Sequence, residues 1–360
     1  MATDKPSQPQ AEELPVRTKE SSSTSSEENE SQAFDIVRTY RDFLSSDRDI
    51  TMPVAAIESL IELMGATPYN TAMELVERVK AEKAKLIACA PNPLPILAGA
   101  DLFEQYLLKS LRGQAEGTSD SNKPLSFDET RQHLLDNRQL FAQRAKAARD
   151  NIAVWGTRYV SDGKVVLTIG GSRTVTKILL RAAQDRSKHF KVIYVLDGKS
   201  RSENAVSELR AAGLEVETIS VAKVAFVLGA QKKINLVLVG SEAITQNGGI
   251  VSGMGTAQLA ALTKSINGGM KRFYVAAETH KIVRKTPIAY PTLQHLGIKQ
   301  KDIGQFEQLG VDVSKDQDAG LLLDEHDEVD YTEPDLIDGF ITEQGIKMAW
   351  QIWEFVDDYL

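Results

Sequence analysis

Five short runs of mostly β-branched and apolar residues, spaced between residues 165 and 276, constrain the fold more than any other feature of this sequence. Most of them are continuously apolar rather than alternating, which is typical of strands buried on both faces of a parallel sheet. The stretches between them are long enough for right-handed crossover helices. The pattern predicts an α/β fold with a Rossmann-like parallel sheet. The predicted strands are Val165–Thr168, Val192–Val195, Val216–Ile219, Leu236–Val239 and Phe273–Ala276.

The preceding part of the sequence has apolar residues at helical spacing instead. One helix is expected to begin at the N-cap Thr51, with Pro53 in its first turn, and the next at the N-cap Thr71. The sequence therefore predicts a helical domain at residues 33–160 and a Rossmann-like domain at residues 161–360. The predicted helices cover residues 34–44, 51–64, 71–90, 96–111 and 127–159.

Residues 1–32 differ from both predicted domains. They contain SSSTSSEENES and almost no apolar side chains. Such a segment cannot bury enough surface to offset its conformational entropy, so we expect a disordered tail. A linker is the favoured function for it, and a tail regulated by phosphorylation is the alternative.

Composition narrows the class of protein. The 360 residues carry a formal net charge of −8, which argues against a direct nucleic-acid partner. Cys89 is the only cysteine, so an intramolecular disulfide is excluded and a cysteine-based metal cluster is not expected. No apolar run approaches the roughly 18 residues that span a bilayer, and the N-terminus lacks a signal-peptide pattern. We therefore expect a cytoplasmic protein without a membrane partner.

A glycine-rich turn follows the first predicted strand. Gly170 and Gly171 allow close approach of a ligand to the backbone, and Ser172 is placed to cap the next helix. The free N–H groups of that helix attract an anion, with Arg173 beside them and Lys281 supplying a second cation from another strand end. These residues predict a pocket for a small phosphorylated ligand. The alternative is a tight turn with an ordinary N-cap.

A second candidate stretch lies between residues 235 and 256. It reads as a buried strand, the acidic residue Glu242 at the strand's carboxyl end, a glycine-rich loop and then a helix. Ligands of open α/β sheets bind at such strand ends, so the loop residues Asn247, Gly248 and Gly249 are further pocket candidates. A lone carboxylate is too little for acid–base catalysis, which needs a second group within hydrogen-bond reach. Dinucleotide and P-loop motifs are missing, and the five histidines are scattered. We therefore predict no catalytic residue and no metal site.

Several motifs together resemble the alpha/beta/delta regulatory subunits of eukaryotic translation initiation factor 2B, and the alpha type matches best. The similarity runs from about residue 34 to residue 360. It rests on VAAIESLIELM, NLVLVGSEAITQNGGI, MGT, FYVAAETHKIVRKTP, VDYTEPDLI and the terminal DDYL. The implied fold is a helical domain followed by a Rossmann-like dimerisation domain.

Related sugar-phosphate isomerases carry a catalytic cysteine in an L-T-H-C-N segment and a catalytic aspartate in a V-G-A-D segment. In this sequence Gly170 stands at the cysteine position and Glu242 at the aspartate position. The isomerases also have N-K-I-G-T where this chain has residues 252–256, SGMGT. The resemblance therefore implies a protein that is not an enzyme. Two alternatives stay open: an isomerase that uses Glu242, and a sensor that binds a sugar phosphate or nucleotide without a catalytic cofactor.

The resemblance implies a regulatory function through protein partners. Family members belong to a decamer that exchanges GDP for GTP on initiation factor 2, with catalysis in another subunit. The implied partners are a second copy of this chain, the beta, gamma, delta and epsilon subunits, and the phosphorylated alpha subunit of initiation factor 2. Carried over by position, Thr71 and Tyr359 are candidates for the phosphoprotein interface in the stress response. Their alternatives are a plain N-cap and ordinary packing.

Overall fold

The computed structural model describes the helical region and the sheet region of the chain. Its described residues from Asp35 onward form one compact unit. The predicted tail at residues 1–32 and Tyr359 lie outside the described residues, and the predicted domain division at residue 160 stays a prediction. The structure describes residues 34–47, 49–69, 71–112, 131–132, 135–136, 139–266, 270–285, 293–298 and 329–357.

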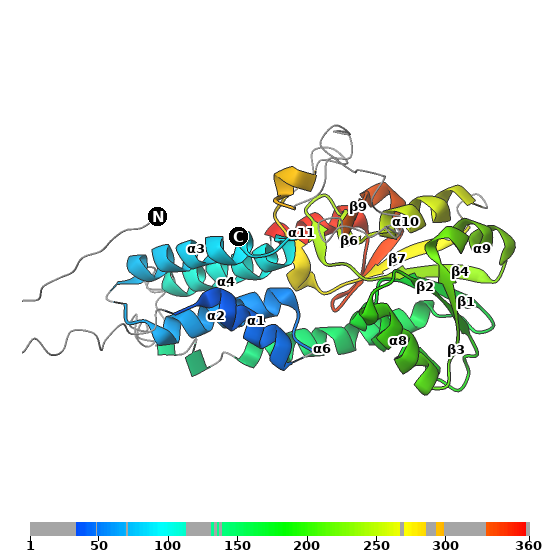
Figure 1. Cartoon of the computed structure of the whole chain (residues 1–360), viewed down its shortest axis with the longest axis horizontal. Coiled ribbons are helices and arrows are strands. Elements are labelled where there is room, and N and C mark those ends of the chain that lie inside the picture. Colours follow the sequence, from blue (N-terminus) through cyan, green and yellow to red (C-terminus); the bar gives the residue numbers. More distant parts are fainter. Residues whose placement is uncertain are drawn as a thin grey trace, which may run out of the picture. The chain divides into compact units, whose positions relative to one another are not determined.

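Helix α2 is the centre of the helical region (Figure 1). It contacts the four other helices described in this region and buries most of its side chains, because its sequence is apolar on nearly every face. A Cβ atom on Gly99 of α4 would lie 2.1 Å from the carbonyl oxygen of Pro53, so the close crossing of α2 and α4 requires glycine. The helices are α1 (Ile36–Ser46), α2 (Met52–Ala66), α3 (Ala72–Ala88), α4 (Leu94–Arg112) and α6 (Gln139–Gly156).

Two predicted N-caps differ in the structure. Thr71 caps α3 as predicted, because its hydroxyl accepts a hydrogen bond from the Glu74 N–H at 3.2 Å. Thr51 occupies the N-cap position of α2, but its hydroxyl makes no capping bond. It is hydrogen-bonded instead to Nε2 of His280, 229 residues further along the chain. The sequence pattern could not reveal this partner.

The parallel sheet is the core of the rest of the chain, and the prediction of an α/β fold is confirmed. Among the described residues it has seven strands in the order β11-β10-β7-β4-β1-β2-β3, all parallel except β11. Chain order reverses between β1 and β4, and such a switch point opens a crevice at the carboxyl ends of the two strands. The strands are β1 (Val165–Ile169), β2 (Lys191–Leu196), β3 (Glu215–Ser220), β4 (Ile234–Val239), β7 (Arg272–Ala276), β10 (Gly339–Thr342) and β11 (Gly345–Lys347).

Helices cover both faces of this sheet, as the unbroken burial of β1 requires. One apolar core packs the sheet against α9 (Val224–Ala230), α10 (Thr256–Ser265) and α11 (Ile352–Asp357). The other packs it against α6, α7 (Arg173–Ala183) and α8 (Ser200–Ala211). Strand β3 lies at the edge and is largely solvent-facing, which explains its more polar sequence.

A second, smaller sheet was not predicted. The expected glycine-rich loop after Glu242 is a hairpin of β5 (Ala243–Thr245) and β6 (Ile250–Gly253). β6 also pairs with β9 (Val329–Thr332), and β5 with β8 (Ile282–Val283), giving the order β8-β5-β6-β9 among the described residues. Helix α4 packs on this sheet through Leu94, Leu97 and Ala98. Thus α4 connects the helical region to the sheet region.

A short helix lies at the C-terminal end of the described residues. A 3₁₀ turn at Ala349–Gln351 precedes α11, which the structure describes to Asp357. Ile352 and Phe355 pack into the core, whereas the side chains of Trp350 and Trp353 are 70% and 51% exposed. The two tryptophans therefore do not serve this chain's own core.

Candidate functional site

The turn between β1 and α7 forms one wall of the crevice. Gly170 and Gly171 have φ of +89° and +61°, which favour glycine, and the Ser172 hydroxyl caps α7 by accepting from the Val175 N–H. A Cβ on Gly171 would lie 2.7 Å from the backbone of Arg201, whereas a Cβ on Gly170 would meet open space. The predicted N-cap is confirmed, and the free space lies at Gly170.

Glu242 lies just beyond β4, the strand that neighbours β1 in the sheet. Its carboxylate accepts a hydrogen bond from the side-chain amide of Asn92 at 2.8 Å and lies 3.8 Å from the guanidinium of Arg201. A Cβ on Gly240 would lie 2.3 Å from the Ser172 hydroxyl, so the β4 turn and the α7 N-terminus are in contact. The structure therefore places the turn that leads to Glu242 against Ser172, and it gives Glu242 two partners, Asn92 and Arg201.

Arg201 and Asn92 were missed by the sequence analysis. Arg201 lies in the first turn of the helix after β2, so the rule that ligands bind at strand ends would have found it. Asn92 lies between α3 and α4, and no sequence pattern connects it with Glu242. Tyr40 is a third neighbour: burial raises its pKa, and the charges of Cys89 and Glu242 raise it further.

The two cations predicted for the pocket are held by internal contacts. The ammonium of Lys281 lies 2.8 Å from the Glu278 carboxylate and donates to the carbonyl of Ser241 at 3.0 Å. The guanidinium of Arg173 donates to the carbonyl of Ile50 at 3.2 Å. Arg201 is thus the cation beside the Glu242 carboxylate.

Asn247, Gly248 and Gly249 form the turn of the β5–β6 hairpin. The amide of Asn247 donates to the Tyr331 hydroxyl at 2.9 Å, and a Cβ on Gly249 would lie 2.1 Å from the same oxygen. A Cβ on Gly248 would meet the carbonyl of Ala349 at 2.3 Å. These contacts are made with β9 and the C-terminal 3₁₀ turn rather than with α7, so they explain the three residues as parts of a tight turn.

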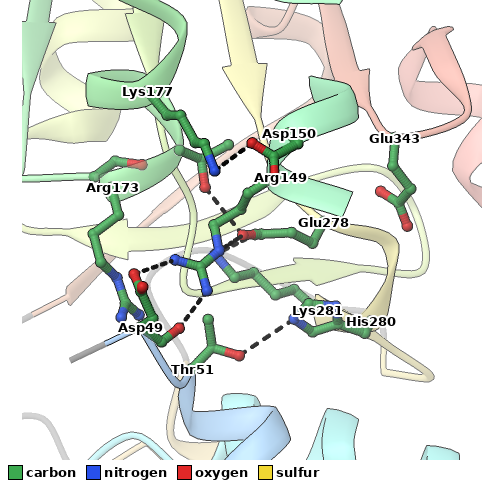
Figure 2. Close-up of polar contacts among 12 residues, drawn as sticks. Asp49, Thr51, Arg149, Asp150, Arg173, Lys177, Glu278, His280, Lys281 and Glu343 are labelled. Carbon is green, nitrogen blue, oxygen red and sulfur yellow. Dashed lines mark hydrogen bonds and ion pairs between the residues drawn. The ribbon is translucent and has the colours of Figure 1, made fainter. Parts of the chain in front are cut away.

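A polar cluster centred on the buried Glu278 lies next to the α7 N-terminus, and we call it the Glu278 cluster (Figure 2). Glu278 follows β7, and its carboxylate accepts a hydrogen bond from Thr174 at 3.0 Å and lies 3.7 Å from Nε of Arg149. Arg149 also contacts both the carboxylate and the carbonyl oxygen of Asp49. The cluster therefore connects α6, α7 and the segment before α2. Its members are Asp49, Thr51, Arg149, Thr174, Glu278, His280 and Lys281.

Two groups of the Glu278 cluster have strongly shifted pKa values. Burial is the largest single effect and would raise the pKa of Glu278, but the charges of Lys281 and His280 and the hydrogen bonds to the carboxylate together outweigh it and lower the pKa to about 2. Burial lowers the pKa of His280 to about 4, against the opposite effect of Glu278. At neutral pH the cluster thus contains an ionised carboxylate, its cations and an uncharged imidazole.

The described part of the chain contains neither a metal-binding cluster nor a membrane-spanning helix. Among those residues no group of three or more His, Cys, Asp or Glu side chains is arranged to hold a metal ion. No helix there is long and apolar enough to cross a bilayer. The phosphoprotein candidate Thr71 lies at the N-terminus of α3 with its side chain exposed.

The sequence of this chain matches a family of translation initiation factor subunits. Residues 46–348 match the family described as the initiation factor 2 subunit family. The chain belongs to the initiation factor 2 subunit family. This membership agrees with the resemblance seen in the sequence. The matched residues include most of the helical region and both sheets.

Known members of the initiation factor 2 subunit family and enzymes are both similar to this chain. It is 26% identical to translation initiation factor eIF2B subunit alpha of Dictyostelium discoideum over 316 residues, which is 86% of this chain and 92% of the relative. It is also 26% identical to ribose 1,5-bisphosphate isomerase of Methanocaldococcus jannaschii over 239 residues, 66% of this chain and 72% of the enzyme. Sequence similarity therefore reaches both classes.

Solved structures confirm the fold. A chain of the tetrameric eIF2B-beta2-delta2 complex from C. thermophilum superposes with a TM-score of 0.65 at 20% identity, covering 90% of this chain and 94% of that one. The translation initiation factor eIF-2B of Pyrococcus horikoshii gives a TM-score of 0.61 at 20% identity, over 87% and 96% of the two chains. At this level of identity the likeness establishes the architecture.

Proposed function

We propose that this chain is a regulatory, non-catalytic subunit of the guanine nucleotide exchange factor for translation initiation factor 2, of the alpha type. The observation that carries the proposal is which residues stand at the two positions that are catalytic in related isomerases. Gly170 stands where related isomerases have a cysteine, at a φ of +89° that an L-residue adopts only with strain. Glu242, at the position of the aspartate, is engaged by Asn92 and Arg201.

The proposed subunit acts through protein partners. It forms a homodimer that bridges the halves of a decamer with the beta, gamma, delta and epsilon subunits in the cytoplasm. The exposed Trp350 and Trp353, together with the half-exposed Met348, supply an apolar surface suited to such contacts. A relative from C. thermophilum is described as a tetrameric beta2-delta2 complex, which supports assembly as a property of this fold.

The helical region is proposed to help sense the phosphorylated alpha subunit of initiation factor 2. Thr71 supports this because it is exposed at a helix N-terminus, where free N–H groups favour negative charge. Its hydroxyl already accepts from Glu74, so its recognition role would add to an existing capping role. Tyr359 is carried over to the same surface as part of the proposal.

Assembly tests the proposal. We expect native mass spectrometry of the purified chain to give twice the 39.6 kDa chain mass, and mixing with the other four subunits to give the larger complex. A chain that stays monomeric at micromolar concentration and fails to join the other subunits would contradict it. Trp350→Ser and Trp353→Ser should weaken the dimer, whereas Phe226→Ser, at an exposed site on α9, serves as the matched control.

A second candidate function uses the same crevice. The open space at Gly170, the α7 N-terminus and Arg201 favour a sugar phosphate or nucleotide bound without turnover. If the chain converts ribose 1,5-bisphosphate and Glu242→Gln abolishes this turnover, the protein is instead an isomerase. Stabilisation against heat by the same compound, without turnover, would support the sensor.

A further inference from the structure

A cavity of about 380 Å³ lies between α2, α4, α6 and the turn that follows β7. It meets the sheet at the ends of β7 and β10, through Thr279 and Glu343, whereas the crevice described above lies at the ends of β1 and β4. Small-molecule sites in proteins have volumes of roughly 300–1,000 Å³, so this cavity is large enough for a compact ligand. The regulatory function proposed above does not involve this cavity.

Most of the cavity wall is apolar. Val54 and Ile57 of α2 line one side, and Leu102 of α4 lines another. Tyr106 and Phe141 pack edge to face at the junction of α4 and α6, with ring centroids 5.8 Å apart. Aromatic edges and faces of this kind attract a flat ring, so the walls favour a planar apolar molecule.

Two cations line the same cavity. Lys109 of α4 and Arg144 of α6 are both exposed, and within the described residues neither forms an ion pair with a carboxylate. Glu343, the one carboxylate among the described lining residues, already accepts hydrogen bonds from the Thr279 N–H, at 3.1 and 3.3 Å, and from its hydroxyl. These bonds direct the Glu343 carboxylate to Thr279, and one carboxylate against Lys109 and Arg144 leaves an excess of one positive charge among the described lining residues.

The imidazole of His280 adds no charge to the cavity wall. His280 lines the wall with its Nε2 bonded to Thr51, and at neutral pH its imidazole is unprotonated. The cavity thus combines apolar walls with an excess of positive charge from Lys109 and Arg144. A ligand with a negative group gains from both.

We propose that this cavity binds a small, flat, apolar molecule that carries one anionic group. The apolar body lies between α2, α4 and α6, and the anion contacts Lys109 and Arg144. Thr279 and His280 belong to the turn η4 (Thr279–Lys281), whose Lys281 donates to Ser241 beside the crevice. A bound ligand therefore stabilises the packing of the helices on this turn, next to the Glu278 cluster.

The full-length chain can be tested with 2-naphthoate, using the uncharged 2-naphthamide as its matched comparison. Isothermal titration should show saturable binding of naphthoate, about tenfold tighter than naphthamide, and the paired change Lys109→Ala with Arg144→Ala should remove this difference. Lys146→Ala, on the exposed side of the same helix α6, should leave both affinities unchanged. Leu102→Trp should block both compounds by filling the cavity.

The proposal is overturned if naphthoate does not saturate by about millimolar concentration, where small fragments of this size normally bind a fitting pocket. It is also overturned if the paired variant binds naphthoate as tightly as the unmodified chain, or if Lys146→Ala weakens it equally. Lys109 and Arg144 are exposed, so the paired variant should fold and decide the question even if Leu102→Trp disturbs folding.

Discussion

His280 gives the structure a specific weakness toward mild acid. Its pKa is lowered from 6.5 to about 4 because the ring is buried beside Arg149 and Lys281. Between these two values the unfolded chain binds a proton at His280 and the folded chain does not. The stability that the neutral ring contributes is therefore present above pH 6.5 and is lost as the pH falls from 6.5 towards 4.

The size of the effect follows from the two pKa values. At 1.36 kcal/mol per pKa unit the full difference corresponds to at most ~3 kcal/mol of unfolding free energy. The ring also lines the cavity and keeps some contact with water, which reduces the penalty for charging it. We therefore expect a loss of about 1–2 kcal/mol between neutral pH and about pH 5.

Urea unfolding of the chain and of His280→Gln at several pH values in this range measures the effect. Asp330, whose burial raises its pKa to about 7, acts with the opposite sign, since its contribution is lost as the pH rises from 3.8 through 7. It is present in both proteins and cancels in their difference. The destabilisation by acid should be smaller in His280→Gln; equal pH dependence in the two proteins, or an NMR titration of His280 near 6.5, would refute the reasoning.

Three further pairs of variants have defined outcomes in urea unfolding. Thr71→Ala should lower stability by about 1 kcal/mol through loss of the α3 cap, whereas Thr71→Ser should not. Gly171→Ala should cost about 2–3 kcal/mol because its Cβ meets the Arg201 backbone at positive φ, and Gly170→Ala should cost only the backbone strain of about 1 kcal/mol. Lys281→Met should cost about 2–4 kcal/mol by leaving buried Glu278 with weaker partners, and adding Glu278→Gln should recover part of that loss. Equal effects within any of these pairs would contradict the contacts described.

The parallel sheet was predictable because burial on both faces leaves a simple mark in the sequence. Leu236–Val239, for instance, is continuously apolar and lies at the centre of the sheet as β4. The second sheet left no such mark. Its strand β6 has four residues and pairs with β9, about 80 positions further on, and such short nonlocal strands show no usable periodicity.

The crevice was predictable in part for the same physical reason. Ser172 and Glu242 follow strands that were recognised, so the strand-end rule located them. The partners Asn92 and Arg201 depend on how the helices pack, and the engagement of Lys281 depends on the burial of Glu278. Local sequence carries neither kind of information. The sequence therefore predicted Lys281 as a cation of the pocket, whereas in the structure it forms an internal ion pair with Glu278.

The most direct test of a regulatory role is the rate of GDP release from initiation factor 2 by the assembled exchange factor. It should be measured with and without this chain, in the presence and absence of phosphorylated initiation factor 2. We predict that the phosphorylated factor inhibits exchange when this chain is present and inhibits much less when it is omitted. Equal inhibition with and without the chain would contradict the account.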